Sequence, residues 1–118
     1  MIKVAIVVLA DTETHEDMAR VHNALLVAKE FKEAKDDIKL IFDGAGTRWI
    51  VELSKPDHMF HELFESLKDK STGACSFCAG AFGVKESAIE SSIPLMEEYE
   101  GHPSFRELLA QGYQIITF

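Results

Sequence analysis

The chain has 118 residues, 47% of them hydrophobic, which is enough for one compact core and too little for two ordinary domains, so we expect residues 1–118 to form a single domain. The formal net charge of −8 repels phosphate backbones and anionic bilayers, so neither nucleic acid nor a membrane is expected as a partner. No apolar run approaches the roughly 18 residues that span a bilayer, and no signal-peptide pattern opens the chain, so we expect a cytoplasmic location.

The N-terminal part of the chain predicts a strand, a long helix and a second strand. Residues 3–9 form a continuous apolar run rich in β-branched side chains, which is typical of a strand buried on both faces. Thr14 to Asp17 resemble a capping box, and apolar residues at helical spacing continue to about residue 35. Residues 38–42 predict the next strand and complete a β-α-β unit.

The middle of the chain predicts two further helices. Thr47 is expected to cap a short helix with Trp49 on its apolar side. Pro56 fits the first position of the next helix, in which Phe60 opens an i, i+3, i+4, i+7 stripe of apolar residues that ends at Leu67. We interpret Trp49 and Phe60 as core or subunit-contact residues.

The rest of the chain continues the alternation of strands and helices. In order, we expect a weak strand over 71–74, a buried helix over 76–84, a short helix and a loop over 85–101, a helix over 103–110 and a closing strand over 113–118. This order predicts an α/β fold, namely a small three-layer α/β/α domain with a mostly parallel, flavodoxin-like sheet. Ligands in such folds bind beyond the carboxyl ends of the strands, where residues 10–15, 43–47 and 75–78 should meet.

Cys75 and Cys78 are the only cysteines, which is too few for the disulfide framework of a small secreted domain. Cys75 stands at a predicted strand-to-helix junction, where backbone N–H groups and the helix dipole favour an anion. We therefore expect its sulfur to meet solvent and its pKa to be lowered, with Cys78 one turn into the helix as a resolving thiol. Cysteine also packs as a small hydrophobe, so a buried structural role stays open.

The segment from Cys75 to Val84, the turn Phe42-Asp43-Gly44-Ala45-Gly46 and the closing residues 112–118 resemble the DsrE/DsrF-like family. In its sulfur-relay members a cysteine ends a strand and a glycine follows at fixed spacing, and Cys75 and Gly83 match these two positions. The resemblance implies that Cys75 accepts a sulfane sulfur as a persulfide and passes it to a partner's thiol. The implied partners are sulfur donor and acceptor proteins or small sulfane-sulfur compounds, and a homo-oligomer (dimer, trimer or hexamer) is also implied. A non-catalytic oligomeric module that binds a small ligand or a protein is the alternative.

Four residues outside the cysteine pair are candidates for the cleft. His15, after the first strand, could move protons there, although such a histidine is more often a solvated loop residue. Asp43, Gly44 and Gly46 form a turn that resembles a phosphate-binding loop but lacks its third glycine, so a tight turn with Asp43 bonded to local backbone is the simpler interpretation.

A metal or cofactor is not expected from the sequence. His58 and His61 together with the two cysteines have the spacing of a Cys2His2 zinc site, but a solvent-exposed helix edge explains the histidines more simply. The cysteine pair also follows the third strand instead of an early one, which disfavours thioredoxin-like redox chemistry.

Overall fold

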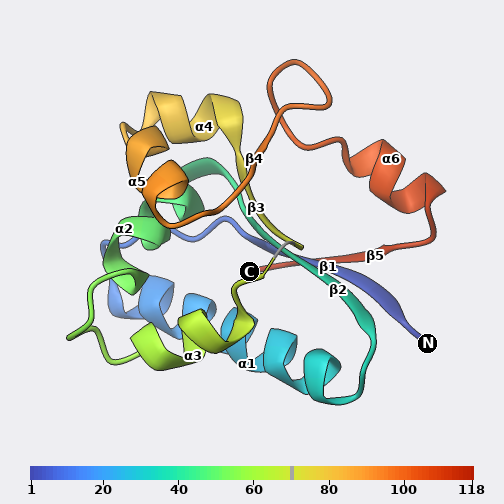
Figure 1. Ribbon diagram of the computed structural model, residues 1–118, viewed down its shortest axis with the longest axis horizontal. Coiled ribbons are helices and arrows are strands. Elements are labelled where there is room, and N and C mark those ends of the chain that lie inside the picture. The colour runs from blue at the N-terminus through green and yellow to red at the C-terminus, as the bar shows by residue number, and fades with distance from the viewer. Residues whose placement is uncertain (70) are drawn as a thin grey trace.

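The computed structural model describes residues 1–69 and 71–118 and confirms the α/β fold (Figure 1). The elements in chain order are β1 (Lys3–Val8), α1 (His15–Glu33), β2 (Asp37–Phe42), the 3-10 helix η1 (Gly44–Arg48), α2 (Trp49–Leu53), α3 (His61–Leu67), β3 (Thr72–Cys75), α4 (Ser76–Ala81), α5 (Lys85–Glu90), β4 (Leu95–Met96), α6 (Phe105–Ala110) and β5 (Gln114–Thr117). None of the helices in the described ranges is long and apolar enough to cross a bilayer.

The five strands of the described residues form one sheet in the order β4-β3-β2-β1-β5, and every neighbouring pair is parallel. Strand β1 is paired on both sides, which agrees with its continuous apolar run. Because all strands run the same way, their carboxyl ends lie along one edge of the sheet, and the segments that follow β2, β3 and β4 start from that edge.

The two faces of the sheet are covered by different helices. Val4, Ile6 and Val8 of β1 join a large core together with residues of α1, α2 and α3. The alternate residues Ala5 and Val7 belong to a smaller core, to which α6 contributes Leu108. In Figure 1, α1 and α3 lie together on one side of the sheet and α6 lies on the other.

The long helix α1 begins as the sequence predicts. The Thr14 side chain accepts a hydrogen bond from the Asp17 N–H, and the Asp17 carboxylate accepts one from the Thr14 N–H, so the capping box is confirmed. Val21 and Leu25 of its apolar stripe are fully buried in the larger core, whereas Met18 at its start is exposed.

Two predicted helix starts are wrong. Thr47 lies inside η1, where its hydroxyl donates to the Gly44 carbonyl, and the cap of η1 is Asp43. Pro56 lies in a series of turns, and α3 begins only at His61. Within these turns the His58 imidazole accepts the Phe60 N–H at 3.0 Å, a local hydrogen bond that competes with helical pairing.

The segment 85–101 contains the predicted short helix, α5, but also a strand that the sequence did not predict. Strand β4 has only two residues and pairs with the end of β3, with Cys75 opposite Met96. The helix predicted over 76–84 is shorter and less buried than expected. Helix α4 ends at Ala81, and Phe77 within it is 60% exposed. Gly83, with φ +70°, follows the end of the helix.

Candidate functional site

Four side chains from three segments meet at the carboxyl edge of the sheet. Asp43 follows β2, Cys75 ends β3, Cys78 lies in α4, and His102 follows β4. One donor atom from each, a carboxylate oxygen, two sulfurs and an imidazole nitrogen, all lie within 4.8 Å of one another.

Cys75 is both the last residue of β3 and the N-cap of α4, so its predicted position at a strand-to-helix junction is confirmed. Its Sγ accepts a hydrogen bond from the Cys78 N–H at 3.4 Å, as a capping side chain does. The Cys-x-x-Cys spacing therefore places the second cysteine in the first turn, where its sulfur faces the first across the cap.

The environment of Cys75 differs from the predicted one. Its side chain is completely buried, and this burial raises the pKa of the Cys75 thiol from its ordinary value of 9.0 to about 12, with the charge of Asp43 acting in the same direction. The Cys78 N–H lowers the pKa of Cys75 but does not offset burial. The prediction that the Cys75 sulfur faces solvent and has a lowered pKa is therefore wrong. The prediction that a backbone N–H points at this sulfur is confirmed.

Asp43 is positioned by the turn after β2. Its Oδ1 accepts the Gly44 N–H at 2.8 Å and lies 3.6 Å from the Cys78 sulfur. Gly44 adopts φ +55°, and at Gly46 a Cβ would lie 2.0 Å from the Val8 carbonyl oxygen. The predicted tight turn with Asp43 bonded to local backbone is thus confirmed, while ligand contacts of the two glycines stay a prediction.

His102 reaches the cysteines through a narrow hairpin. The Tyr99 and His102 backbones exchange two hydrogen bonds of 2.9 and 2.8 Å across a turn in which Glu100 and Gly101 have positive φ. The imidazole packs on the Phe77 ring, with centroids 4.9 Å apart, and its Nδ1 lies 3.1 Å from the Cys75 sulfur and 3.9 Å from that of Cys78. With the imidazole proton on Nε2, the Cys75 thiol donates to Nδ1.

The sequence did not single out His102 as a site residue. It is 27 residues from Cys75 and shows no ligand or catalytic spacing to it. The signal that could have revealed it is topological, because a strand parallel to β3 carries the following residues to the same edge of the sheet.

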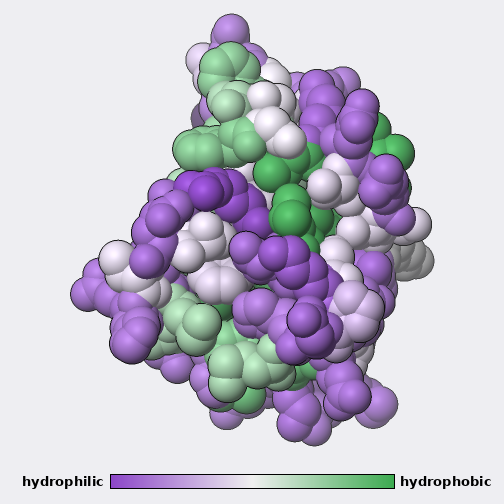
Figure 2. Space-filling view, turned by 90° about the vertical axis from the view of Figure 1, so that its left-hand side faces the viewer, coloured by the Kyte–Doolittle hydropathy of each residue, from purple (hydrophilic) through white to green (hydrophobic). Residues whose placement is uncertain are grey.

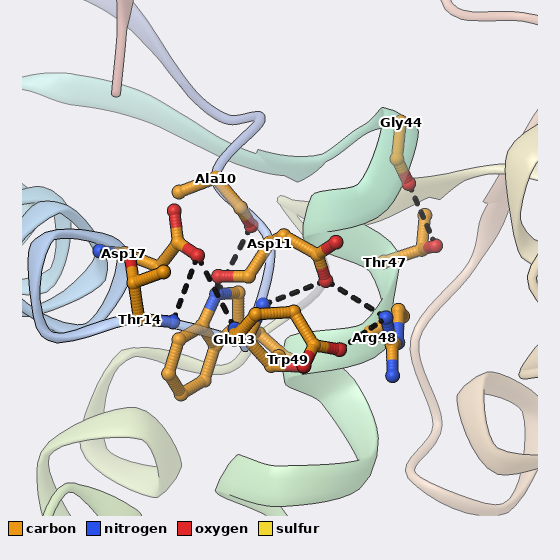
Figure 3. Close-up of polar contacts among 10 residues, drawn as sticks. Ala10, Asp11, Glu13, Thr14, Asp17, Gly44, Thr47, Arg48 and Trp49 are labelled. Carbon is orange, nitrogen blue, oxygen red and sulfur yellow. Dashed lines mark hydrogen bonds and ion pairs between the residues drawn. The ribbon is translucent and has the colours of Figure 1, made fainter.

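His15 is not part of this cluster. It is exposed at the start of α1 and borders a separate hollow with His22 and Phe60. The preceding loop is fixed against α2 instead: the Trp49 indole donates to the carbonyls of Ala10 and Asp11, as Figure 3 shows.

Arg48 fixes the same loop from η1. Its guanidinium lies 3.0 Å from Asp11 and 2.9 Å from Glu13, so this arginine is paired with acidic residues of the loop after β1 (Figure 3). Among the residues that the structure describes, no salt bridge joins a lysine or arginine to Asp43.

His58 and His61 do not approach the cysteines. His58 packs its ring against Trp49 and Phe60, and the His61 Nδ1 lies 2.7 Å from the Leu53 carbonyl. Both histidines therefore serve the packing of the segment between α2 and α3, and the Cys2His2 combination considered from the sequence does not exist in the structure.

The surface around α2, α4 and α5 mixes hydrophilic residues with smaller hydrophobic patches (Figure 2). The exposed apolar side chains in or next to α4 and α5 are Phe77, Phe82 and Ile89. Phe77 links this surface to the cluster, because its ring covers the His102 imidazole.

The cluster offers two sulfurs, a base and a carboxylate to one small volume. An imidazole in contact with a thiol is the arrangement in which a cysteine is activated as a nucleophile. A second thiol within reach allows a mixed persulfide or disulfide to be resolved. The same four donors also match the ligand types of a thiolate-rich metal site.

Comparisons with known proteins agree with the fold. The family model described as the DsrE/DsrF-like family matches residues 3–118. The uncharacterized protein MJ0733 of Methanocaldococcus jannaschii is 36% identical over 94 residues, which are 80% of this chain and 76% of that protein. A conserved protein of unknown function from Bacteroides thetaiotaomicron, BT1422, superposes with a TM-score of 0.65 over 97% of this chain and 94% of its own, and at 20% identity it supports the fold alone.

Proposed function

This chain belongs to the DsrE/DsrF-like family, and from that premise we propose that it carries sulfane sulfur as a persulfide on Cys75. The observation that carries the proposal is the position of the Cys75 sulfur at the start of α4, 3.1 Å from Nδ1 of His102. A base within hydrogen-bond reach of a nucleophile is the basic requirement for activating a thiol whose own pKa is high.

Loading and unloading are two displacements at sulfur. The Cys75 sulfur attacks the outer sulfur of a donor persulfide, the bond between the donor's two sulfurs breaks, and the donor leaves as a thiolate. His102 takes the Cys75 proton as the new bond forms. An acceptor thiolate then attacks the outer sulfur, and Cys75 leaves and is protonated again. Sulfane sulfur moves without net oxidation, so no external oxidant is required.

Cys78 has the position of a resolving thiol. Its attack on the inner sulfur of the Cys75 persulfide would form a Cys75–Cys78 disulfide and release hydrogen sulfide. Cys78 is half-buried whereas Cys75 is sealed, so a donor meets Cys78 first, and loading of Cys75 requires the surrounding side chains to move aside.

The test is intact-mass analysis of the reduced full chain after incubation with polysulfide. We expect one added sulfur that dithiothreitol removes, its absence in Cys75→Ala, and its retention for longer in Cys78→Ala, which serves as the matched control. If Cys75→Ala still gained the sulfur and Cys78→Ala did not, the carrier would be Cys78 and the proposal would be wrong.

One observation favours a second candidate, a non-catalytic module that binds a small ligand or a protein at the strand ends. The complete burial of Cys75 and its raised pKa are what a packing cysteine shows. For such a module Cys75 gains no sulfur from polysulfide in the folded protein, so the mass of the Cys78→Ala variant, in which Cys75 is the one cysteine left, separates the two candidates.

A further inference from the structure

We infer that Asp43, Cys75, Cys78 and His102 form a binding site for one zinc ion. Each residue contributes one donor atom, and the four atoms lie within 4.8 Å of one another. Thiolate, imidazole and carboxylate are the three side-chain ligand types of protein zinc sites. This inference goes beyond the proposed function, because a metal can bind here whether or not sulfur is ever transferred.

Three of the six distances between donor atoms approximate the edges of a coordination tetrahedron, and the other three are at most 4.8 Å. Zinc bonds of 2.0 to 2.3 Å place neighbouring ligand atoms of a tetrahedron about 3.3 to 3.8 Å apart. The Cys75 sulfur lies 3.1 Å from the His102 nitrogen, the Cys78 sulfur lies 3.9 Å from the same nitrogen, and 3.6 Å separate the Cys78 sulfur from Asp43. Only shifts of a few tenths of an ångström along these three edges are needed to receive the ion.

The ligands are held in place by their own surroundings. The Asp43 carboxylate is oriented by the Gly44 N–H, and the cysteines are fixed by the start of α4. The His102 ring is held by its hairpin with Tyr99 and by packing on Phe77. Partners that orient ligands in this way raise metal affinity, since little order has to be gained on binding.

The charges in the cluster also call for a cation. Asp43 has no lysine or arginine in salt-bridge contact among the described residues, and it shares its surroundings with two thiols. On binding, both thiols release their protons, and the dication balances two of the resulting three negative charges. Sulfur ligands select zinc over the hard ions magnesium and calcium, which require oxygen.

The experiment is titration of the reduced, chelator-treated full chain with zinc, followed by native mass spectrometry, and in parallel with Co²⁺ followed by absorption spectroscopy. We expect one ion per chain, a sulfur-to-cobalt charge-transfer band and the intense ligand-field bands of tetrahedral Co²⁺. Loss of one ligand in Cys78→Ser, His102→Gln or Asp43→Asn should weaken binding at least about 100-fold, because even outer-shell changes cost 10- to 100-fold.

His61→Gln is the matched control, since it removes an imidazole that lies outside the cluster, and it should bind zinc as the parent chain does. Circular dichroism of each variant checks that the chain is folded, and the half-buried Cys78 and His102 provide variants that spare the sealed core position. No metal uptake by the folded parent chain, an octahedral cobalt spectrum, or uptake that Cys78→Ser and His102→Gln leave unchanged would overturn the inference. None of these results depends on polysulfide chemistry, so failure here and failure of the proposed function are distinguishable.

Discussion

The sulfur of Cys75 and Nδ1 of His102 lie 3.1 Å apart although 27 residues separate them in the chain. Two pieces of backbone create this contact. Strand β4 pairs in parallel with the end of β3, with Cys75 opposite Met96, and the hairpin from Tyr99 to His102 then turns back toward the start of α4. The Phe77 N–H donates to the Gly101 carbonyl at 2.9 Å and holds the hairpin against the helix.

The contact predicts a role for His102 in loading Cys75 with sulfur. Replacement by glutamine in His102→Gln keeps a polar side chain but removes the base, so the rate of persulfide formation should fall about 100-fold, the lower range for general-base catalysis. The measurement is the time course of sulfur gain by intact mass at fixed polysulfide concentration. His61→Gln, which removes a histidine elsewhere, should load at the parental rate, and equal rates for the two variants would exclude His102 as the base.

The two thiols should differ in accessibility. A thiol with pKa near 12 has roughly 1,000 times less thiolate at neutral pH than one at 9.0, and Cys75 is also fully buried. We expect iodoacetamide to modify the half-buried Cys78 in folded Cys75→Ser readily, and to modify Cys75 in folded Cys78→Ser far more slowly, because the side chains around Cys75 must first move aside. Peptide mapping of each single-cysteine variant gives the rates. Fast labelling of folded Cys78→Ser would mean that the Cys75 sulfur is exposed in solution.

The parts of the fold with strong local patterns could be predicted from the sequence. The apolar run of β1 and the capping box of α1 depend on neighbouring residues alone, and both occur as expected. The carboxyl-edge position of Asp43 and the cysteines followed from the alternation of strands and helices.

The missed features depend on contacts distant in sequence. Strand β4 consists of Leu95 and Met96 after a proline, too short for any pattern, and it is a strand only because β3 lies beside it. Because β4 is not predictable from the sequence, the position of His102 next to the cysteines is not predictable either. The burial of Cys75 was missed for the same reason, because the hairpin that lies against it starts from β4.

Two glycines near the site should respond oppositely to alanine. At Gly46 a Cβ would lie only 2.0 Å from the Val8 carbonyl oxygen. Gly46→Ala must therefore separate the backbone at residue 46 from the end of β1, and it should lower the free energy of unfolding by about 3 kcal/mol or more. Gly80 lies in α4 with nothing within 4 Å of a new Cβ, so Gly80→Ala should raise the free energy by roughly 0.5 to 1 kcal/mol. Urea denaturation of both variants tests the pair, and similar effects at both positions would contradict the close approach at Gly46.

Tyr113 predicts a loss of stability at alkaline pH. Its hydroxyl donates to Asp37 at 2.9 Å, and burial, helped by that bond and by the charge of Asp37, raises the pKa of Tyr113 above its ordinary value of 10.0. A raised pKa in the folded state contributes stability below pH 10, and this contribution disappears as the pH rises through the folded-state pKa.

Tyr113→Phe isolates this effect from other groups that titrate in the same range. Below pH 10 the variant should be less stable than the parent by about 1 kcal/mol, the net contribution of one hydrogen bond. The difference between the two free energies of unfolding should shrink as the pH is raised above 10. A difference that stays constant between pH 8 and 11 would show that the hydroxyl titrates alike in both states.

Zinc and sulfane sulfur should exclude each other at the cluster. Zinc would bind the sulfurs of both Cys75 and Cys78, the persulfide forms on the sulfur of Cys75, and a sulfur bound to zinc is less available to attack a donor. With one equivalent of zinc, the full chain should therefore gain sulfur at least about ten times more slowly, and a chelator should restore the rate; magnesium, which does not bind thiolates, should have no effect. Asp43→Asn provides the sharpest comparison, because it removes a metal ligand and leaves both thiols and His102 in place. In that variant, a zinc concentration that slows sulfur loading of the parent chain should no longer slow the loading of Cys75.

If the parent chain binds zinc with both thiols and still loads sulfur at the metal-free rate, the two reactions cannot share these sulfurs, and persulfide formation must be assigned to an opened form of the site.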